Sequence, residues 1–78
     1  MITTTHSYRD FVFTIEYRPE GVIHKVDFPD LPDIITSGNT LAEAFANACE
    51  AVDLHLESLQ KLGERLPRPK HRIAVETA

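Results

Sequence analysis

The sequence predicts a small α+β protein in which one helix packs across an antiparallel sheet of three or four strands. Three observations support this fold class. Apolar and polar residues alternate through the first half of the chain, the spacing changes to that of a helix after Thr40, and 78 residues can bury only one thin core. We therefore expect residues 1–78 to form a single domain with the element order β-β-β-α-β.

Two alternating segments near the N-terminus predict a β-hairpin. Residues 10–17 and 22–28 each place apolar side chains at every second position, which is the period of a strand with one buried face. Between them, Arg18-Pro19-Glu20-Gly21 is typical of a tight turn, because proline fixes φ and glycine adopts positive φ easily. Residues 1–8 are expected to form a flexible tail before this hairpin.

A loop with two prolines follows the hairpin, and it is the predicted binding surface. Proline removes a backbone donor and fixes φ, so strand pairing must pause between Phe28 and Asp33. A stiff loop that offers apolar groups beside carboxylates loses little entropy when it binds a partner. The residues expected nearest to a partner are Pro29, Asp30, Leu31, Pro32 and Asp33. The alternative is that the loop only connects two strands, the second being the short β-branched segment 34–37.

A long amphipathic helix is predicted after Thr40. Thr40 and Glu43 match a capping box at its start, and Gly63 is a natural C-terminal stop. One apolar stripe is expected to face the sheet; its members are Leu41, Phe45, Ala48, Val52, Leu56 (or His55), Leu59 and Leu62. Beyond the helix, residues 66–69 must be extended, and residues 72–77 alternate as a last, edge-like strand that could pair with a second copy of the chain.

Composition and motifs favour binding over catalysis. Twelve acidic against eight basic residues give a net charge of −4, which favours a basic partner. Asp27, Asp30 and Asp33 match no known metal-binding loop, and no catalytic motif or cofactor loop is visible, so we expect no enzyme activity, no metal and no cofactor. The basic segment 61–72 is interpreted either as a solvated helix end or as a contact for phosphate or an acidic patch. No signal peptide or membrane-spanning run is apparent, so the cytoplasm is expected.

From Tyr17 to Pro69 the chain resembles the HicB antitoxin family. The resemblance is carried by Phe28-Pro29-Asp30-Leu31-Pro32-Asp33, Thr36-Ser37-Gly38-Asn39-Thr40, Ala42-Glu43-Ala44 and Pro67-Arg68-Pro69, in the order and spacing of that family. Asp33, Ile34, Asn39 and Ala42 depart from the residues usual in the family. These departures leave the implied fold unchanged and bear on which loop residues touch a partner.

The resemblance implies a partial ribonuclease-H-like domain without that fold's catalytic carboxylates. It also implies the function of an antitoxin in a type II toxin-antitoxin system, which binds and neutralises a HicA-type toxin, a small basic ribonuclease that cleaves mRNA. A homodimer or tetramer is expected. Family members commonly add a C-terminal DNA-binding domain; this chain ends at Ala78, so DNA binding by it alone is not expected. Two alternatives remain open, an orphan self-assembling domain and a ribonuclease-H-like, RNA-binding remnant that uses Asp27, Asp30 and the basic tail.

Overall fold

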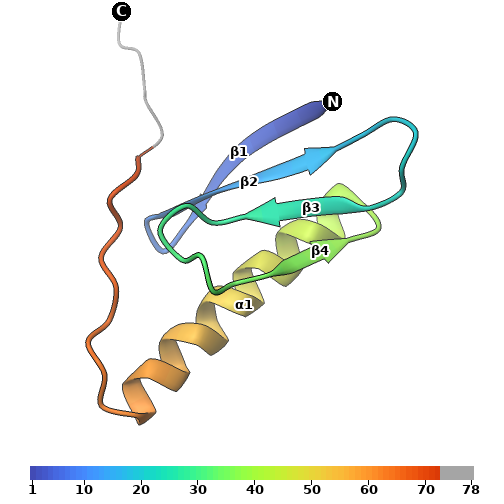
Figure 1. The fold of residues 1–78 in the computed structure, drawn as a ribbon. Helices are drawn as coiled ribbons and strands as arrows, with labels where there is room; N and C mark the ends of the chain where they lie inside the picture. Colours follow the sequence, from blue (N-terminus) through green and yellow to red (C-terminus); the bar gives the residue numbers. More distant parts are fainter. Residues whose placement is uncertain (73–78) are drawn as a thin grey trace, which may run out of the picture.

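A computed structural model describes residues 1–72 as one four-stranded antiparallel sheet with a single long helix on one face (Figure 1). The elements in chain order are β1 (Ile2–Tyr8), β2 (Phe11–Tyr17), β3 (His24–Asp27), β4 (Thr36–Gly38) and α1 (Leu41–Lys61), and the strands lie side by side in that same order. The predicted α+β class is confirmed. All but the first residue of the predicted last strand, residues 72–77, lie outside the described residues.

Strand β1 corrects the prediction that residues 1–8 form a tail. It pairs with β2 along its whole length, and a turn of only two residues, Arg9 and Asp10, joins the two strands. Both turn residues have positive φ, 51° and 69°, as the tight turn that matches the twist of a hairpin requires. This turn usually contains Asn-Gly or Asp-Gly, so the Arg-Asp sequence hid it.

The hairpin of β2 and β3 is confirmed. The two strands pair in an antiparallel register from Thr14 opposite Asp27 to Tyr17 opposite His24. In the turn between them, the Gly21 N–H donates to the Arg18 carbonyl at 2.9 Å. The predicted third strand is also present as β4, two residues later than expected at its start.

Helix α1 begins and ends where its capping residues dictate. The Thr40 Oγ1 accepts a hydrogen bond from the Glu43 N–H at 3.0 Å, which satisfies a donor that the first turn leaves free. At the other end, Gly63 has a φ of 70° and its N–H donates to the Gln60 carbonyl, while the Glu64 N–H donates to the Leu59 carbonyl. This pair of bonds is the Schellman arrangement, for which a left-handed residue is needed.

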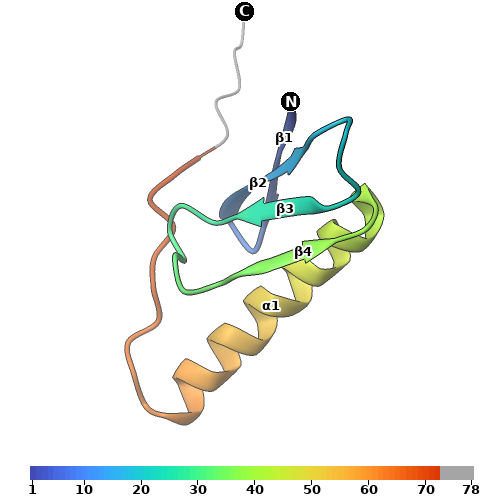
Figure 2. The ribbon, with the colours of Figure 1, turned by 45° about the vertical axis from the view of Figure 1, so that its right-hand side comes forward.

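The core lies between α1 and the sheet. It consists of Phe11, Phe13, Ile15, Val26, Phe28, Leu31, Ala44, Ala48 and Val52, all less than one-tenth exposed. The helix meets the sheet over β3 and β4 and then continues past its edge (Figures 1 and 2). Three members of the predicted apolar stripe pack less than expected: Leu41 at its start is 44% exposed, Phe45 is 38% exposed, and Leu62 at its end is 72% exposed.

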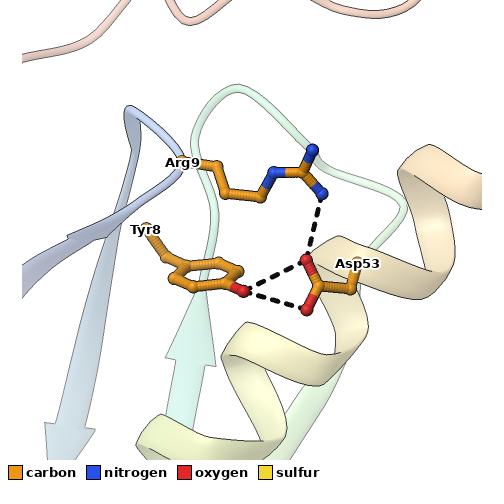
Figure 3. A network of polar contacts seen from close by, with 3 residues as sticks. All are labelled: Tyr8, Arg9 and Asp53. Atoms are coloured by element: carbon orange, nitrogen blue, oxygen red, sulfur yellow. Dashed lines mark hydrogen bonds and ion pairs between the residues drawn. The ribbon is translucent and has the colours of Figure 1, made fainter.

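A polar contact ties the β1–β2 turn to the middle of α1. The Tyr8 hydroxyl and the Arg9 guanidinium both donate to the Asp53 carboxylate, at 2.9 and 3.1 Å (Figure 3). The hydrogen bond to Asp53 is the largest cause that raises the pKa of Tyr8 above its ordinary value. This contact holds the turn at Arg9 and Asp10 against the helix.

Candidate functional site

The loop that joins β3 to β4 is built from two successive β-turns. The Leu31 N–H donates to the Phe28 carbonyl at 3.3 Å, and the Ile34 N–H donates to the Leu31 carbonyl at 3.0 Å. Pro29 and Pro32 each occupy the second position of a turn, where the fixed φ of proline fits. The sequence Phe-Pro-Asp-Leu-Pro-Asp therefore encodes a stiff double turn.

The structure divides the five predicted binding residues into two groups. Pro29, Pro32 and Asp33 are exposed, so among these five they are the side chains that a partner can reach. Leu31 is only 2% exposed, so the prediction that it offers apolar surface is wrong. The reason is that the chain turns inward between the two prolines, which places Leu31 in the core.

Asp30 is also turned away from solvent, and it holds the chain that follows α1. Its side chain is 5% exposed. Its carboxylate accepts hydrogen bonds from the Lys70 N–H at 2.7 Å, the His71 N–H at 2.8 Å and the His71 Nδ1 at 2.6 Å. The backbone bond from His71 is the largest cause that lowers the pKa of Asp30 below 3.8. Asp30 thus fixes residues 70 and 71 beside the loop.

This contact predicts a contribution of Asp30 to acid stability. A carboxyl group whose pKa is lower in the folded than in the unfolded chain stabilises the fold above its unfolded pKa, here near 3.8, and loses that contribution as the pH falls through the folded value. We expect the free energy of unfolding to fall less between about pH 5 and pH 2 in Asp30→Asn than in the wild type. Urea denaturation across this range measures the difference.

Asp33→Asn is the matched control, because it removes the same charge from an exposed position of the same loop. It should follow the wild-type pH dependence closely. Equal acid losses in the wild type and Asp30→Asn would contradict the assigned contact.

An open groove separates the loop from the chain after α1. Pro29, Asp30 and Pro32 line one side, and the other side is lined by Arg65, Leu66, Pro67, Arg68, Lys70 and His71. The fold thus brings the basic segment noted in the sequence next to the proline loop. Because the Asp30 carboxylate is engaged, the groove presents mainly cationic and apolar side chains. The sequence did not predict that these two segments are neighbours, because they lie far apart in the chain and nothing in residues 28–33 indicates a contact with residues 65–71.

Other candidate chemical groups are dispersed. Among residues 1–72, no group of three His, Cys, Asp or Glu side chains is placed to hold a metal ion. Cys49 is partly buried on α1, and burial raises the pKa of its thiol. In the same part of the chain, no helix is both long and apolar enough to cross a membrane.

Comparison with known protein families gives a match that covers most of this chain. Residues 11–77 match the family described as the HicB_like antitoxin of bacterial toxin-antitoxin systems. The chain belongs to this family. The match starts at the first residue of β2 and includes the double-turn loop, β3, β4 and α1, whereas β1 lies outside it.

Two curated proteins are similar in sequence to part of this chain. An uncharacterised 14.9 kDa protein from the rep-hol intergenic region of Haemophilus phage HP1 is 42% identical over 43 residues, which is 55% of this chain and 32% of the phage protein. The UPF0150 protein Ta0767 of Thermoplasma acidophilum is 39% identical over 51 residues, which is 65% of this chain and 74% of that protein. This chain thus spans about a third of the phage relative. No solved structure matched the chain significantly, so the partial ribonuclease-H-like relationship stays a prediction.

Proposed function

We propose that this HicB-like chain neutralises a HicA-type, mRNA-cleaving toxin by binding it stoichiometrically in the cytoplasm. The observation that carries the proposal is the family match over residues 11–77, because this family consists of antitoxins. Such a function requires a folded surface rather than a catalytic group.

The proposed contact surface is the exposed part of the double-turn loop, namely Pro29, Pro32 and Asp33. Two prolines hold these residues in one conformation before binding, so little entropy is lost when a partner orders them. Asp30 and Leu31 contribute from inside, since one fixes the following chain and the other anchors the loop in the core.

Charge supports association in two different ways. The net charge of −4 attracts a basic protein from a distance. At the loop itself, however, Pro29 and Pro32 line a groove that also contains Arg65, Arg68 and Lys70, so the local surface beside the loop is cationic. We therefore expect long-range attraction to come from the whole molecule, and local specificity to come from the shape and charge of the loop.

Co-expression with the small basic protein encoded beside this chain tests the proposal. Rescue of growth together with a co-purifying complex is the expected result. A toxic neighbour that is neither bound nor neutralised would overturn the proposal and favour an orphan, self-assembling domain.

A charge reversal then tests the position of the contact. Asp33→Lys and Glu20→Lys change the net charge equally, but Glu20 lies in the exposed turn between β2 and β3, at the opposite end of β3 from the loop. We expect Asp33→Lys to raise the dissociation constant at least about tenfold more than Glu20→Lys, because it changes a proposed contact as well as the overall charge. Equal effects would place the contact elsewhere on the molecule.

The cationic groove favours a second candidate function, binding of RNA through its phosphates. Three cations beside an apolar wall suit a phosphate backbone, although the net charge opposes it. Salt-sensitive binding of RNA by the pure protein, weakened by Arg68→Ala, would support this candidate. Absence of RNA binding at low salt would exclude it.

A further inference from the structure

A strap leaves the C-terminal end of α1 and turns back beside the double-turn loop. We define the strap as residues 64–71, and in both ribbon views it passes the end of the sheet that carries this loop (Figures 1 and 2). Its start is set by the helix stop, where the Glu64 N–H donates to the Leu59 carbonyl at 2.9 Å. Pro67 and Pro69 stiffen its middle, because they fix φ and keep the residues before them extended. The strap therefore leaves the helix in a defined direction and stays extended.

The far end of the strap is held by Asp30 from within the loop. The backbone N–H groups of Lys70 and His71 donate to one carboxylate oxygen, Oδ2, and the His71 ring bonds the other, Oδ1. Because two of the three donors belong to the backbone, the contact fixes the path of the strap and not only one side chain. The Asp30 side chain is 5% exposed, and a buried carboxylate that loses its donors is costly. Asp30 and the strap thus stabilise each other.

Asp30 also lies in the middle of the loop, so its contact with the strap bears on the conformation of the loop. It is the third residue of the first turn, which the Leu31 N–H closes on the Phe28 carbonyl. The rotamers open to a side chain depend on the φ and ψ of its backbone, so a fixed Asp30 side chain restricts the backbone of this turn. The exposed residues proposed to contact the toxin lie directly before and after it.

We propose that the strap clamps the double-turn loop, through Asp30, in the conformation that binds the toxin. The clamp itself follows from the contacts at Asp30, whereas its effect on toxin affinity rests on the proposed antitoxin function. Two partners that favour the same conformation strengthen each other's binding by equal factors, typically about 5- to 150-fold. The strap therefore raises toxin affinity, and the toxin in turn holds the strap more tightly to Asp30.

The consequence is a control of toxin binding from outside the contact surface. A loop that the strap already orders loses less entropy when the toxin binds. Any change that draws the strap away from Asp30 lowers toxin affinity, although it alters none of the exposed residues Pro29, Pro32 and Asp33. The chain after α1 thus regulates a site that is about forty residues away in sequence.

A pair of substitutions at Lys70 isolates one backbone bond of the clamp. Lys70→Pro removes the lysine charge and also the N–H that donates to Asp30, whereas Lys70→Ala removes the same charge and keeps the N–H. Lys70 is exposed on the strap, so neither substitution disturbs the core between α1 and the sheet. A difference between the two variants therefore reports on the bond to Asp30.

Hydrogen exchange in the free protein tests the clamp without any toxin. The amides of Leu31 and Ile34 close the two turns of the loop, and we expect them to exchange at least about fivefold faster in Lys70→Pro than in Lys70→Ala. The Val52 amide, in the buried part of α1, should exchange equally in both variants, which checks that the fold is intact. Equal exchange at Leu31 and Ile34 would overturn the clamp.

Asp30→Asn and Asp33→Asn form a second matched pair, in which the change is made on the loop. Each removes one carboxylate, but only Asp30 bonds the strap. The amides of Lys70 and His71 should exchange faster in Asp30→Asn than in the wild type and stay unchanged in Asp33→Asn. The same exchange in both variants would contradict the hold of Asp30 on the strap.

Toxin affinity tests the other half of the proposal, with the small basic protein encoded beside this chain as the toxin. The dissociation constant should be about tenfold higher for Lys70→Pro than for Lys70→Ala, and the toxin should slow exchange of the wild-type His71 amide by a similar factor. Equal dissociation constants would refute the link between strap and toxin. A wild type that binds no toxin would refute the proposed function instead, and the exchange of Leu31 and Ile34 would still decide the clamp.

Discussion

Gly38→Ala is expected to destabilise the fold by about 2–4 kcal/mol. Gly38 ends β4 directly before α1, and a Cβ atom there would lie 2.3 Å from the Ala44 N and 2.7 Å from its Cα. These are backbone atoms of the first turn of α1, so no side chain can rotate to make room. The helix would have to move away from β4, which would open the core at Ala44 and Ala48. Urea or thermal denaturation measures the loss.

Gly21→Ala and Gly63→Ala are matched controls for this prediction. At Gly21 the nearest atom to an added Cβ is the Arg18 carbonyl oxygen at 3.8 Å, so stability should change little. At Gly63 there is open space but a φ of 70°, so only backbone strain of about 1 kcal/mol is expected. A Gly38→Ala protein as stable as Gly21→Ala would show that β4 and α1 do not approach this closely.

This geometry explains the family motif around Gly38. In Thr36-Ser37-Gly38-Asn39-Thr40, the glycine allows the strand to touch the helix, and Thr40 then caps that helix two residues later. The motif therefore specifies the corner between the sheet and the helix. Its neighbour, the Phe28–Asp33 segment, specifies the stiff loop at the opposite end of β4.

Elements that depend on neighbouring residues were predicted well from sequence. The turn at Gly21, the cap at Thr40 and the helix stop at Gly63 each follow from one backbone requirement and one suitable residue. Alternation of apolar residues likewise located β2 and β3, because Phe13 and Ile15 on β2 and Val26 on β3 are more buried than the residues that follow them.

Elements that depend on distant residues were missed. Strand β1 is largely polar and owes its order to pairing with β2 and to the contact between its turn and Asp53. The inward position of Asp30 depends on residues about forty positions later in the chain. Leu31 was placed on the surface because its two flanking prolines indicated a loop, and pattern alone cannot show which residue of a loop points inward.

Helical periodicity likewise could not show how deeply each residue of the apolar stripe on α1 is buried. Periodicity placed Phe45 among the buried residues, yet it lies at the margin, 38% exposed, against His6 and Phe13. Phe13, by contrast, is fully buried at the centre of the core, where its ring centroid lies 4.9 Å from that of Phe28 and 5.4 Å from that of His6. The same residue type thus occupies two very different environments.

Phe13→Ala should therefore remove about 3–5 kcal/mol of stability, through lost burial and the cavity left among the surrounding rings. That is a large part of the roughly 5–15 kcal/mol that stabilises a typical domain, so much of the protein would be unfolded at growth temperature. Phe45→Ala deletes the same atoms from the margin and should have about half this effect or less, because solvent already reaches the site. Denaturation of both variants measures the contrast, and equal losses would show that α1 sits deeper on the sheet, with Phe45 part of the core.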